Sequence, residues 1–486
     1  MRIRSYALAS LSALALTACA AGPDPVAHVP SPRATTGPFL SAEEGTVTPT
    51  PLPADWWRLY DDPVLDTLVA DAIAANTDLR QASARIARAR AALRGARAGR
   101  LPQTNLGAGS NYSRASETQA PGLADREGWK FDAGLDIAYE IDLFGRVGRG
   151  IEAAREDVAA AQADADAVQV MVVADTTRAY AEAASLAAQI AVANRIVGLL
   201  DDSLTLTRGR HDAGLESGLA VARIETLREQ RAAEIPTLEA QRRAALFALA
   251  TLTGRAPAEL PEIAGQRSIA LEIDTPLPVG DGAALLARRP DIRAAERRVV
   301  ASGARIGVAK ADLYPRITLG GSIGATAPSL ADLFTGGALN FLVGPLVDWA
   351  FPNREPALAQ VDAAKAEADI ALAAFDGTVL SALQETETAL SNYARSLDRR
   401  ARLQAAVAAA ERAATITRGR QREGIVDSLE LIDAERTLAE ASAALAQQDG
   451  AVSRAQIDLF RSLGGGWSNR ELASGQPVGD GNAPGV

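Results

Sequence analysis

The stretch WKFDAGLDIAYEID, residues 129–142, alternates strictly between apolar and polar side chains. Its odd-numbered positions are all apolar, and its even-numbered positions carry the charged residues Lys130, Asp132, Asp136, Glu140 and Asp142. A period of two is typical of a strand with unlike surroundings on its two faces. A soluble sandwich strand can alternate in the same way, but long alanine-rich helical segments flank this stretch. We therefore interpret it as a strand between lipid and a water-filled lumen, with the five charges facing the lumen.

The composition of the chain favours long helices and excludes several classes of protein. Of 486 residues, 48% are hydrophobic and only 4% aromatic, and the formal net charge is −10. The mean hydropathy is near zero. No run of eighteen apolar residues follows the N-terminus, which excludes a bundle of membrane-spanning helices. The negative charge argues against nucleic acid as a partner.

Residues with catalytic or metal-binding chemistry are scarce. The chain has two histidines, His28 and His211, and one cysteine, Cys19. These numbers exclude a disulfide, a His/Cys metal site and a histidine-based catalytic triad. No glycine-rich stretch has the lysine and the spacing of a phosphate loop. We therefore predict that the protein is not an enzyme and has no metal site and no cofactor.

The N-terminus has the features of an export signal. Two arginines precede an apolar stretch, which the tetrapeptide LTAC closes at Cys19. This tetrapeptide resembles a bacterial lipobox, in which the cysteine becomes the lipidated (palmitate-carrying) first residue. The resemblance implies a signal peptide over 1–18 and lipidation of Cys19. Ala20, at a position where inner-membrane lipoproteins carry Asp, implies the outer membrane.

The remainder of the chain is predicted to be a duplicated structure of mainly helical class. The segment Thr207–Arg210 (TRGR) matches Thr417–Arg420 at an offset of 210, and Gly214 matches Gly424 at the same offset. Further towards the N-terminus, Pro102 matches Pro315 at an offset of 213. Matches spaced so widely with almost no slippage indicate an internal structural repeat.

Each repeat is predicted to contain a helix, a strand pair, a very long helix, a turn and a final helix. An extended tether, 19–54, precedes them. The first repeat, 55–255, has strands 101–113 and 129–142, a long helix 149–211 and a helix 219–253, which Pro236 is expected either to kink or to reset. After a connector at 256–282, the second repeat, 283–465, has strands 315–325 and 338–349, a long helix 355–421 and a helix 428–463. Residues 466–486 are predicted to be a disordered tail.

Four strands cannot close a barrel around a lumen, and an open sheet edge is not tolerated in lipid. Several copies of the chain must therefore share one barrel. Three copies supply twelve strands, which gives a wide channel. We accordingly predict a homotrimer with a 12-stranded transmembrane β-barrel that an α-helical barrel continues. The charges of residues 130–142 sum to three negative charges per chain, which predicts a preference for cations.

Residues 50–465 resemble the outer-membrane efflux protein (TolC-like) family, in the lipoprotein subgroup often labelled NodT. The motifs that carry the resemblance are DWWRLYDDPVLDTLV, NTDLRQA, YEIDLFGRV and RHDAGLESGLAV, with RQREGIVDSLELIDAE as the counterpart of the last. The resemblance implies an outer-membrane exit duct with a periplasmic α-helical tunnel. It also implies a tripartite pump, in which a periplasmic membrane-fusion adaptor and an inner-membrane transporter, of the RND type, are the partners. The expected cargo is small molecules such as drugs or toxic compounds, as in multidrug resistance.

The family places two Arg-x-x-x-Gly turns at the periplasmic tip, where the adaptor docks. In this chain the turns run from Arg210 to Gly214 and from Arg420 to Gly424. The candidate docking residues are Arg210, Gly214, Ser217, Arg420, Gly424 and Asp427. Where the family often has Ser-x-Leu-Asp, the chain reads Ser217-Gly218-Leu219-Ala220 after the first glycine and Asp427-Ser428-Leu429-Glu430 after the second. These departures leave the charge of the first tip, and hence adaptor choice, open. Independently of docking, both glycines fit ordinary helix C-terminal positions with positive φ.

Two other functions remain compatible with the sequence. A type I protein-secretion duct has the same fold. A lipid-anchored periplasmic coiled-coil scaffold explains the long helices, although it leaves the two amphipathic strand pairs without a role.

Overall fold

The computed structural model describes residues 37–43, 45–114, 116, 118 and 127–467. The predicted signal peptide, Cys19 and most of the tether and tail lie outside these residues. The described chain forms two compact units. Unit 1 contains 85–162 and 294–376, and unit 2 contains 37–84, 163–293 and 377–467. The units do not follow the two sequence repeats, since each combines segments from both.

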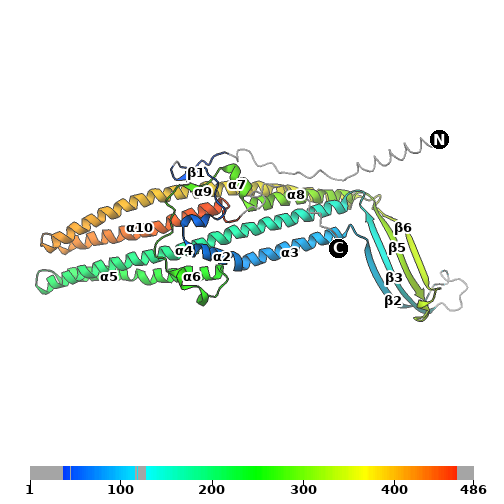
Figure 1. Ribbon diagram of the computed structural model, residues 1–486, viewed down its shortest axis with the longest axis horizontal. Helices are drawn as coiled ribbons and strands as arrows, with labels where there is room; N and C mark the ends of the chain where they lie inside the picture. Colours follow the sequence, from blue (N-terminus) through cyan, green and yellow to red (C-terminus); the bar gives the residue numbers. More distant parts are fainter. Residues whose placement is uncertain (1–36, 44, 115, 117, 119–126, 468–486) are drawn as a thin grey trace. The chain divides into compact units, whose positions relative to one another are not determined.

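Unit 1 contains a four-stranded antiparallel sheet. Its strands are β2 (Gln103–Arg114), β3 (Glu127–Ile141), β5 (Arg316–Ala327) and β6 (Leu339–Asp348). The order is β2-β3-β5-β6, so that the second strand of the first repeat pairs with the first strand of the second repeat. Figure 1 shows β2 and β6 as the outer strands. A short 3-10 turn, η4 (Asp332–Phe334), lies between β5 and β6.

The register of this sheet aligns apolar residues across all four strands. Leu106 is opposite Leu135, which is opposite Ile323, which is opposite Phe341. Directly opposite residues share a face, so these four side chains form one row. The next row along, on the other face, contains Asn105, Asp136 and Ser322, and ends at Leu342 of β6. The alternation that is visible in β3 therefore continues in β2 and β5, whereas β6 is apolar on both faces.

Four helices cross the boundary between the two units. They are α3 (Thr77–Ala98), α4 (Arg146–Asp212), α8 (Pro290–Ala311) and α9 (Glu355–Arg422). Among the described residues, α4 is the one helix whose length and composition would allow it to cross a membrane, and 44% of the apolar window is buried. The buried core helix of a soluble protein can have the same length and composition, so this finding is weak support for a membrane-spanning helix.

The remaining helices belong to unit 2. They are α2 (Pro63–Ala75), α5 (Gly218–Ala232), α6 (Glu234–Leu252), α7 (Gly282–Arg288) and α10 (Ser428–Ser462), with 3-10 turns η1 (Trp56–Tyr60), η2 (Pro257–Glu259) and η3 (Glu262–Gly265). The core of the unit includes Trp56, which is fully buried and stacks on Phe460 with ring centroids 4.7 Å apart. Asp62 caps α2 by accepting hydrogen bonds from the backbone N–H groups of Val64 and Leu65.

The single helix predicted for 219–253 is two helices in the structure. α5 ends at Ala232 and α6 begins at Glu234, so the break precedes Pro236. Pro236 lies in the first turn of α6. A proline has no N–H for the carbonyl oxygen of the residue four positions before it, which is here Ala232, the last residue of α5. Pro236 therefore fits a reset of the helix, one of the two outcomes expected from the sequence.

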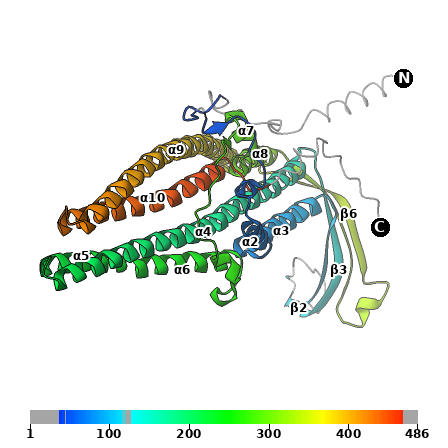
Figure 2. The same cartoon turned by 60° about the vertical axis from the view of Figure 1, so that its left-hand side comes forward.

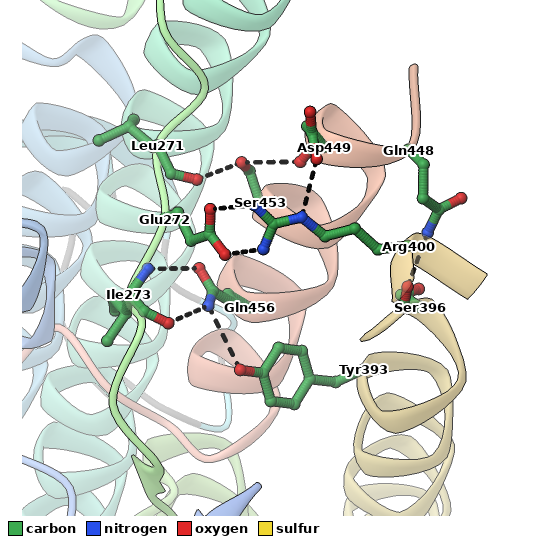
Figure 3. Close-up of polar contacts among 10 residues, drawn as sticks. All are labelled: Leu271, Glu272, Ile273, Tyr393, Ser396, Arg400, Gln448, Asp449, Ser453 and Gln456. Atoms are coloured by element: carbon green, nitrogen blue, oxygen red, sulfur yellow. Dashed lines mark hydrogen bonds and ion pairs between the residues drawn. The ribbon is translucent and has the colours of Figure 1, made fainter. Parts of the chain in front are cut away.

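The connector between the repeats is bound firmly to helices of the second repeat (Figure 3). It contributes β4 (Leu277–Pro278), which pairs in parallel with β1 (Val47–Thr48). Ser453 of α10 donates to the carbonyl oxygen of Leu271, and Gln456 of α10 both accepts from and donates to the backbone of Ile273.

An ion-pair cluster completes this attachment. Arg400 of α9 forms an ion pair with Glu272 of the connector and donates to Asp449 of α10 at 2.8 Å. Burial raises the pKa of Glu272, although the hydrogen bonds from Arg400 oppose this effect. The connector therefore contacts both α9 and α10.

Candidate functional sites: two helical turns and the faces of the sheet

The turn between α4 and α5 is built around Gly214. Its φ is +74°, and its backbone N–H donates to the carbonyl oxygen of His211 while that of Leu215 donates to Arg210. These two bonds satisfy carbonyl groups that the helix end leaves without partners. Ser217 then begins α5, because its hydroxyl accepts from the N–H of Ala220 at 3.3 Å. The predicted turn residues thus end α4 just before Gly214 and provide the N-cap of α5 at Ser217.

The turn between α9 and α10 has the same backbone. Gly424 has a φ of +72°, and the N–H of Ile425 donates to the carbonyl oxygen of Arg420. Asp427 caps α10 with two hydrogen bonds of 3.0 Å, from the N–H groups of Leu429 and Glu430. Figures 1 and 2 show both turns at the same end of unit 2.

The two turns are also linked to each other. Arg210 Nη1 donates to the carbonyl oxygen of Gln421 at 3.4 Å, and the Arg210 guanidinium lies 3.7 Å from Glu216. Arg210 therefore joins the first turn to the end of α9. A Cβ atom added at Gly214 or Gly424 would meet nothing within 4 Å, so the space beside both glycines is open.

An arginine–glutamate pair, whose contact the sequence analysis did not predict, supports each turn. Arg208 of α4 donates to Glu225 of α5 at 3.1 Å, and Arg418 of α9 donates to Glu435 of α10 at 2.9 Å. Both pairs span seventeen residues and are related by the offset of 210. The hydrogen bonds with Glu435 raise the pKa of Arg418. Matching an Arg–Glu spacing at the repeat offset would have identified these pairs from sequence.

Four of the five predicted lumen charges, Lys130, Asp132, Asp136 and Glu140, lie on one face of β3. Lys130 is opposite Asn111, Asp132 is opposite Gly109, and Asp136 is opposite Asn105. A Cβ at Gly109 would lie 3.2 Å from the carboxylate of Asp132, so the glycine leaves room for that side chain.

Two of the five predicted lumen charges, Glu140 and Asp142, make contacts with the start of α4. Glu140 pairs with Arg146 at the start of α4, with Nε donating at 2.9 Å. The predicted strand position of Asp142 is wrong, because β3 ends at Ile141. The Asp142 carboxylate instead accepts from the N–H groups of Val147 and Gly148, at 3.0 and 2.7 Å. It therefore caps the first turn of α4, where the helix dipole favours a negative charge.

No group of three or more His, Cys, Asp or Glu residues within the described ranges could hold a metal ion. The polar side chains described above act as helix caps, ion pairs and strand-face charges.

The comparisons with known proteins agree with this architecture. The profile of the family described as "Outer membrane efflux protein" matches residues 68–255 and 283–465. The chain belongs to the outer membrane efflux protein family. Two matched segments separated by a gap agree with the internal repeat.

Individual members of the family match over most of their length. The chain is 32% identical to outer membrane protein OprJ of Pseudomonas aeruginosa, over 85% of this chain and 86% of the relative. It is 31% identical to the pyoverdine export outer membrane protein OpmQ of the same organism, over 85% and 88%. The solved structure of the outer-membrane channel OprN superimposes with a TM-score of 0.85 at 36% identity, covering 92% of this chain and 99% of that one.

Family membership, fold and relatives together establish the general function. The protein is an outer-membrane channel component of an efflux system, with a TolC-like fold. Its relatives are efflux channel proteins rather than enzymes. The predicted outer-membrane location and the predicted mainly helical, TolC-like fold of the chain are therefore confirmed. The trimer, the closed 12-stranded barrel and the lipid anchor stay predictions.

Proposed function

We propose that three copies of the chain form the exit duct of a tripartite pump. The observation that carries this proposal is the pair of open sheet edges. Within the described residues, β2 and β6 each pair with one strand only. In lipid, each unsatisfied backbone group costs several kcal/mol, so these edges need partners. Pairing β6 of one copy with β2 of the next preserves the antiparallel alternation around a closed barrel.

We propose that the apolar row through Leu135 faces lipid and that the row through Asp136 faces the lumen. With Glu140 paired and Asp142 capping α4, the free charges on this face of β3 are Lys130, Asp132 and Asp136. The net of these three residues is one negative charge per chain and three per trimer. The sequence alone had indicated three negative charges per chain. The cation preference of the channel should accordingly be modest, and it should fall with increasing salt.

This assignment of faces is tested by a pair of substitutions on neighbouring residues. Leu135→Arg should cost about 2–4 kcal/mol in the assembled barrel, because it places a cation at lipid depth. Asp136→Asn should leave assembly unchanged and reduce cation selectivity in reconstituted bilayers. Normal assembly of Leu135→Arg together with loss of the trimer in Asp136→Asn would reverse the two faces.

The two turns are the proposed docking site for a periplasmic adaptor, which connects the duct to an inner-membrane transporter of the RND type. Their matched backbone and the open space beside Gly214 and Gly424 support this proposal, because a partner can approach both turns. Around them, Arg210, Ser217, Arg420 and Asp427 supply polar contacts.

Gly424→Trp tests the docking site. The indole would project into open space and obstruct a partner, while the barrel is unaffected. Efflux and adaptor cross-linking should both fall at matched trimer levels, and the same change at Gly214 should be milder, because Ala220 departs from the family pattern at that turn. Wild-type efflux with unchanged cross-linking would remove the turns from the mechanism.

The proposed cargo is small molecules, which move passively from the periplasm to the outside. The name of OpmQ assigns it the export of pyoverdine, and the names of other relatives assign them efflux. A deletion strain should become sensitive to several small toxic compounds and regain resistance on complementation. A strain that instead loses a secreted protein and keeps its resistance would favour the type I secretion duct.

We further propose that Cys19, which lies outside the described residues, is lipidated and anchors the tether. Cys19→Ser should slow assembly, and the barrel should still retain the trimer in the membrane. Complete release of this variant into the periplasm would favour the lipid-anchored scaffold instead.

A further inference from the structure

Unit 1 contains two equivalent sets of elements, one from each repeat. Helix α3 (Thr77–Ala98) leads into β2, and α8 (Pro290–Ala311) leads into β5 at an offset of 213. Helix α4 follows β3, and α9 follows β6; these two helices end at Asp212 and Arg422, at an offset of 210. Only one of the two possible junctions between the sets is made within a chain, the junction of β3 with β5.

At that junction, the helices next to the strands also make contact. Arg305 of α8 donates to Asp157 of α4 at 2.6 Å, and Arg297 donates to Glu156 at 3.2 Å. Small residues fill the space between the ion pairs, since Ala160 of α4 is 4% exposed and Ala301 of α8 is fully buried. The pairing of β3 with β5 is thus accompanied by an electrostatic and apolar contact between α4 and α8.

The equivalent face of α9 is uncovered. Ile370 stands at the position of Ala160 and is 62% exposed. Glu367 stands at the position of Asp157 and is exposed, and it forms no ion pair within the described part of the chain. Between 355 and 376, this helix has five carboxylates, Glu355, Asp362, Glu367, Asp369 and Asp376, against one cation, Lys365.

The equivalent face of α3 is also uncovered, and its charge is opposite. Residues 85–98 of α3 contain five arginines and no acid: Arg85, Arg88, Arg90, Arg94 and Arg97. All five are exposed, and none has an ion pair within the described part of the chain. Arg88 stands where α8 has the buried Ala301, one helical turn before the position of Arg305. Residues four apart share a helix face, so Arg88 lies on the face that α8 uses.

We propose that α3 of one copy binds α9 of the adjacent copy, with Arg88 facing Glu367. This inference rests on the proposed trimer. If β6 of one copy pairs with β2 of the next, α9 and α3, which adjoin those strands in the chain, are brought together as α4 and α8 are by the pairing of β3 with β5. The seam between copies then repeats the α4–α8 contact, with an arginine in place of the alanine. Complementary charges across such a contact favour the correct partner and disfavour incorrect ones.

A charge exchange tests the seam. Arg88→Glu and Glu367→Arg should each lower the trimer-to-monomer ratio of the detergent-extracted protein by about tenfold, because each places like charges opposite one another. The double variant Arg88→Glu/Glu367→Arg should return the ratio to within about threefold of wild type. The ratio is measured by light scattering after chromatography, at low and high salt, and the single-variant defects should shrink at high salt.

The matched control is Arg97→Glu. Arg97 is an exposed arginine of the same helix, nine residues from Arg88 and therefore on the opposite side. Arg97→Glu should leave the trimer-to-monomer ratio unchanged.

If the ratio of the double variant Arg88→Glu/Glu367→Arg falls by the product of the two single losses, the two residues act independently, and the proposed contact between α3 and α9 is overturned. A wild-type protein that is not trimeric would overturn the proposed function first, so the two failures are distinct. Circular dichroism of each variant separates a loss of helix from a loss of assembly.

Discussion

At the first helical turn the Arg208–Glu225 ion pair is about half exposed, with side-chain exposures of 52% and 51%. At the second turn the equivalent Arg418–Glu435 pair is largely buried, at 26% and 3%. The residue types, the spacing and the glycine conformation are the same. The difference arises from packing, because the Arg418 guanidinium also lies near Asp202 of α4, whereas the first pair is at the surface. Duplication has preserved the backbone of the turn, and the surroundings have diverged.

The difference in burial between the two ion pairs should have its largest effect on the free energy of unfolding when the glutamate of each pair is removed. Glu435→Ala leaves a largely buried guanidinium without its carboxylate and should lower the free energy of unfolding by about 3 kcal/mol. Glu225→Ala removes an exposed pair and should cost about 0.5 kcal/mol. Denaturant unfolding followed by circular dichroism measures both. Equal losses would mean that assembly buries the first pair as well, and the comparison would then hold only for the isolated chain.

The next effect should be the same at both turns, because it depends on the backbone. Gly214→Ala and Gly424→Ala should each cost about 1–2 kcal/mol, since an L-residue is strained at positive φ. Neither variant suffers a clash, because the added Cβ meets nothing within 4 Å.

Gly209→Ala and Gly419→Ala are the matched controls for these turns. Both glycines lie inside the long helices, with open space around the added Cβ. Alanine there should stabilise by about 0.5–1 kcal/mol. A turn variant that behaves like its helical control would show that the positive φ is absent in solution.

The features that could be predicted from sequence are those with a local cause. Strict alternation identified β3, and a glycine between two helical segments identified each turn. The fold class followed from the length of the helices and from the repeat. These features depend on a residue and its near neighbours, so one sequence is sufficient to find them.

The features that the sequence did not reveal depend on where an element stops or on what packs against it. The alternation continues to Asp142, but the strand does not, because the carboxylate caps α4. Pro236 indicated either a kink or a reset of the helix, and the sequence alone did not decide between them; in the structure α5 ends at Ala232 and α6 begins at Glu234. The burial of Glu435 depends on contacts between segments that are distant in sequence, and no local pattern reports it.

The smallest expected effect concerns the residues that begin the returning helices. Asp427 accepts two hydrogen bonds of 3.0 Å and places a negative charge at the N-terminus of α10, whereas Ser217 accepts one of 3.3 Å. Asp427→Ala should therefore cost about 1 kcal/mol, and Ser217→Ala about 0.5 kcal/mol. Asp427→Ser and Ser217→Asp exchange the caps between the turns, and unfolding measurements should show the first slightly destabilised and the second slightly stabilised. If the exchanged caps reverse this order, the surroundings of each turn rather than the capping side chain determine the difference between them.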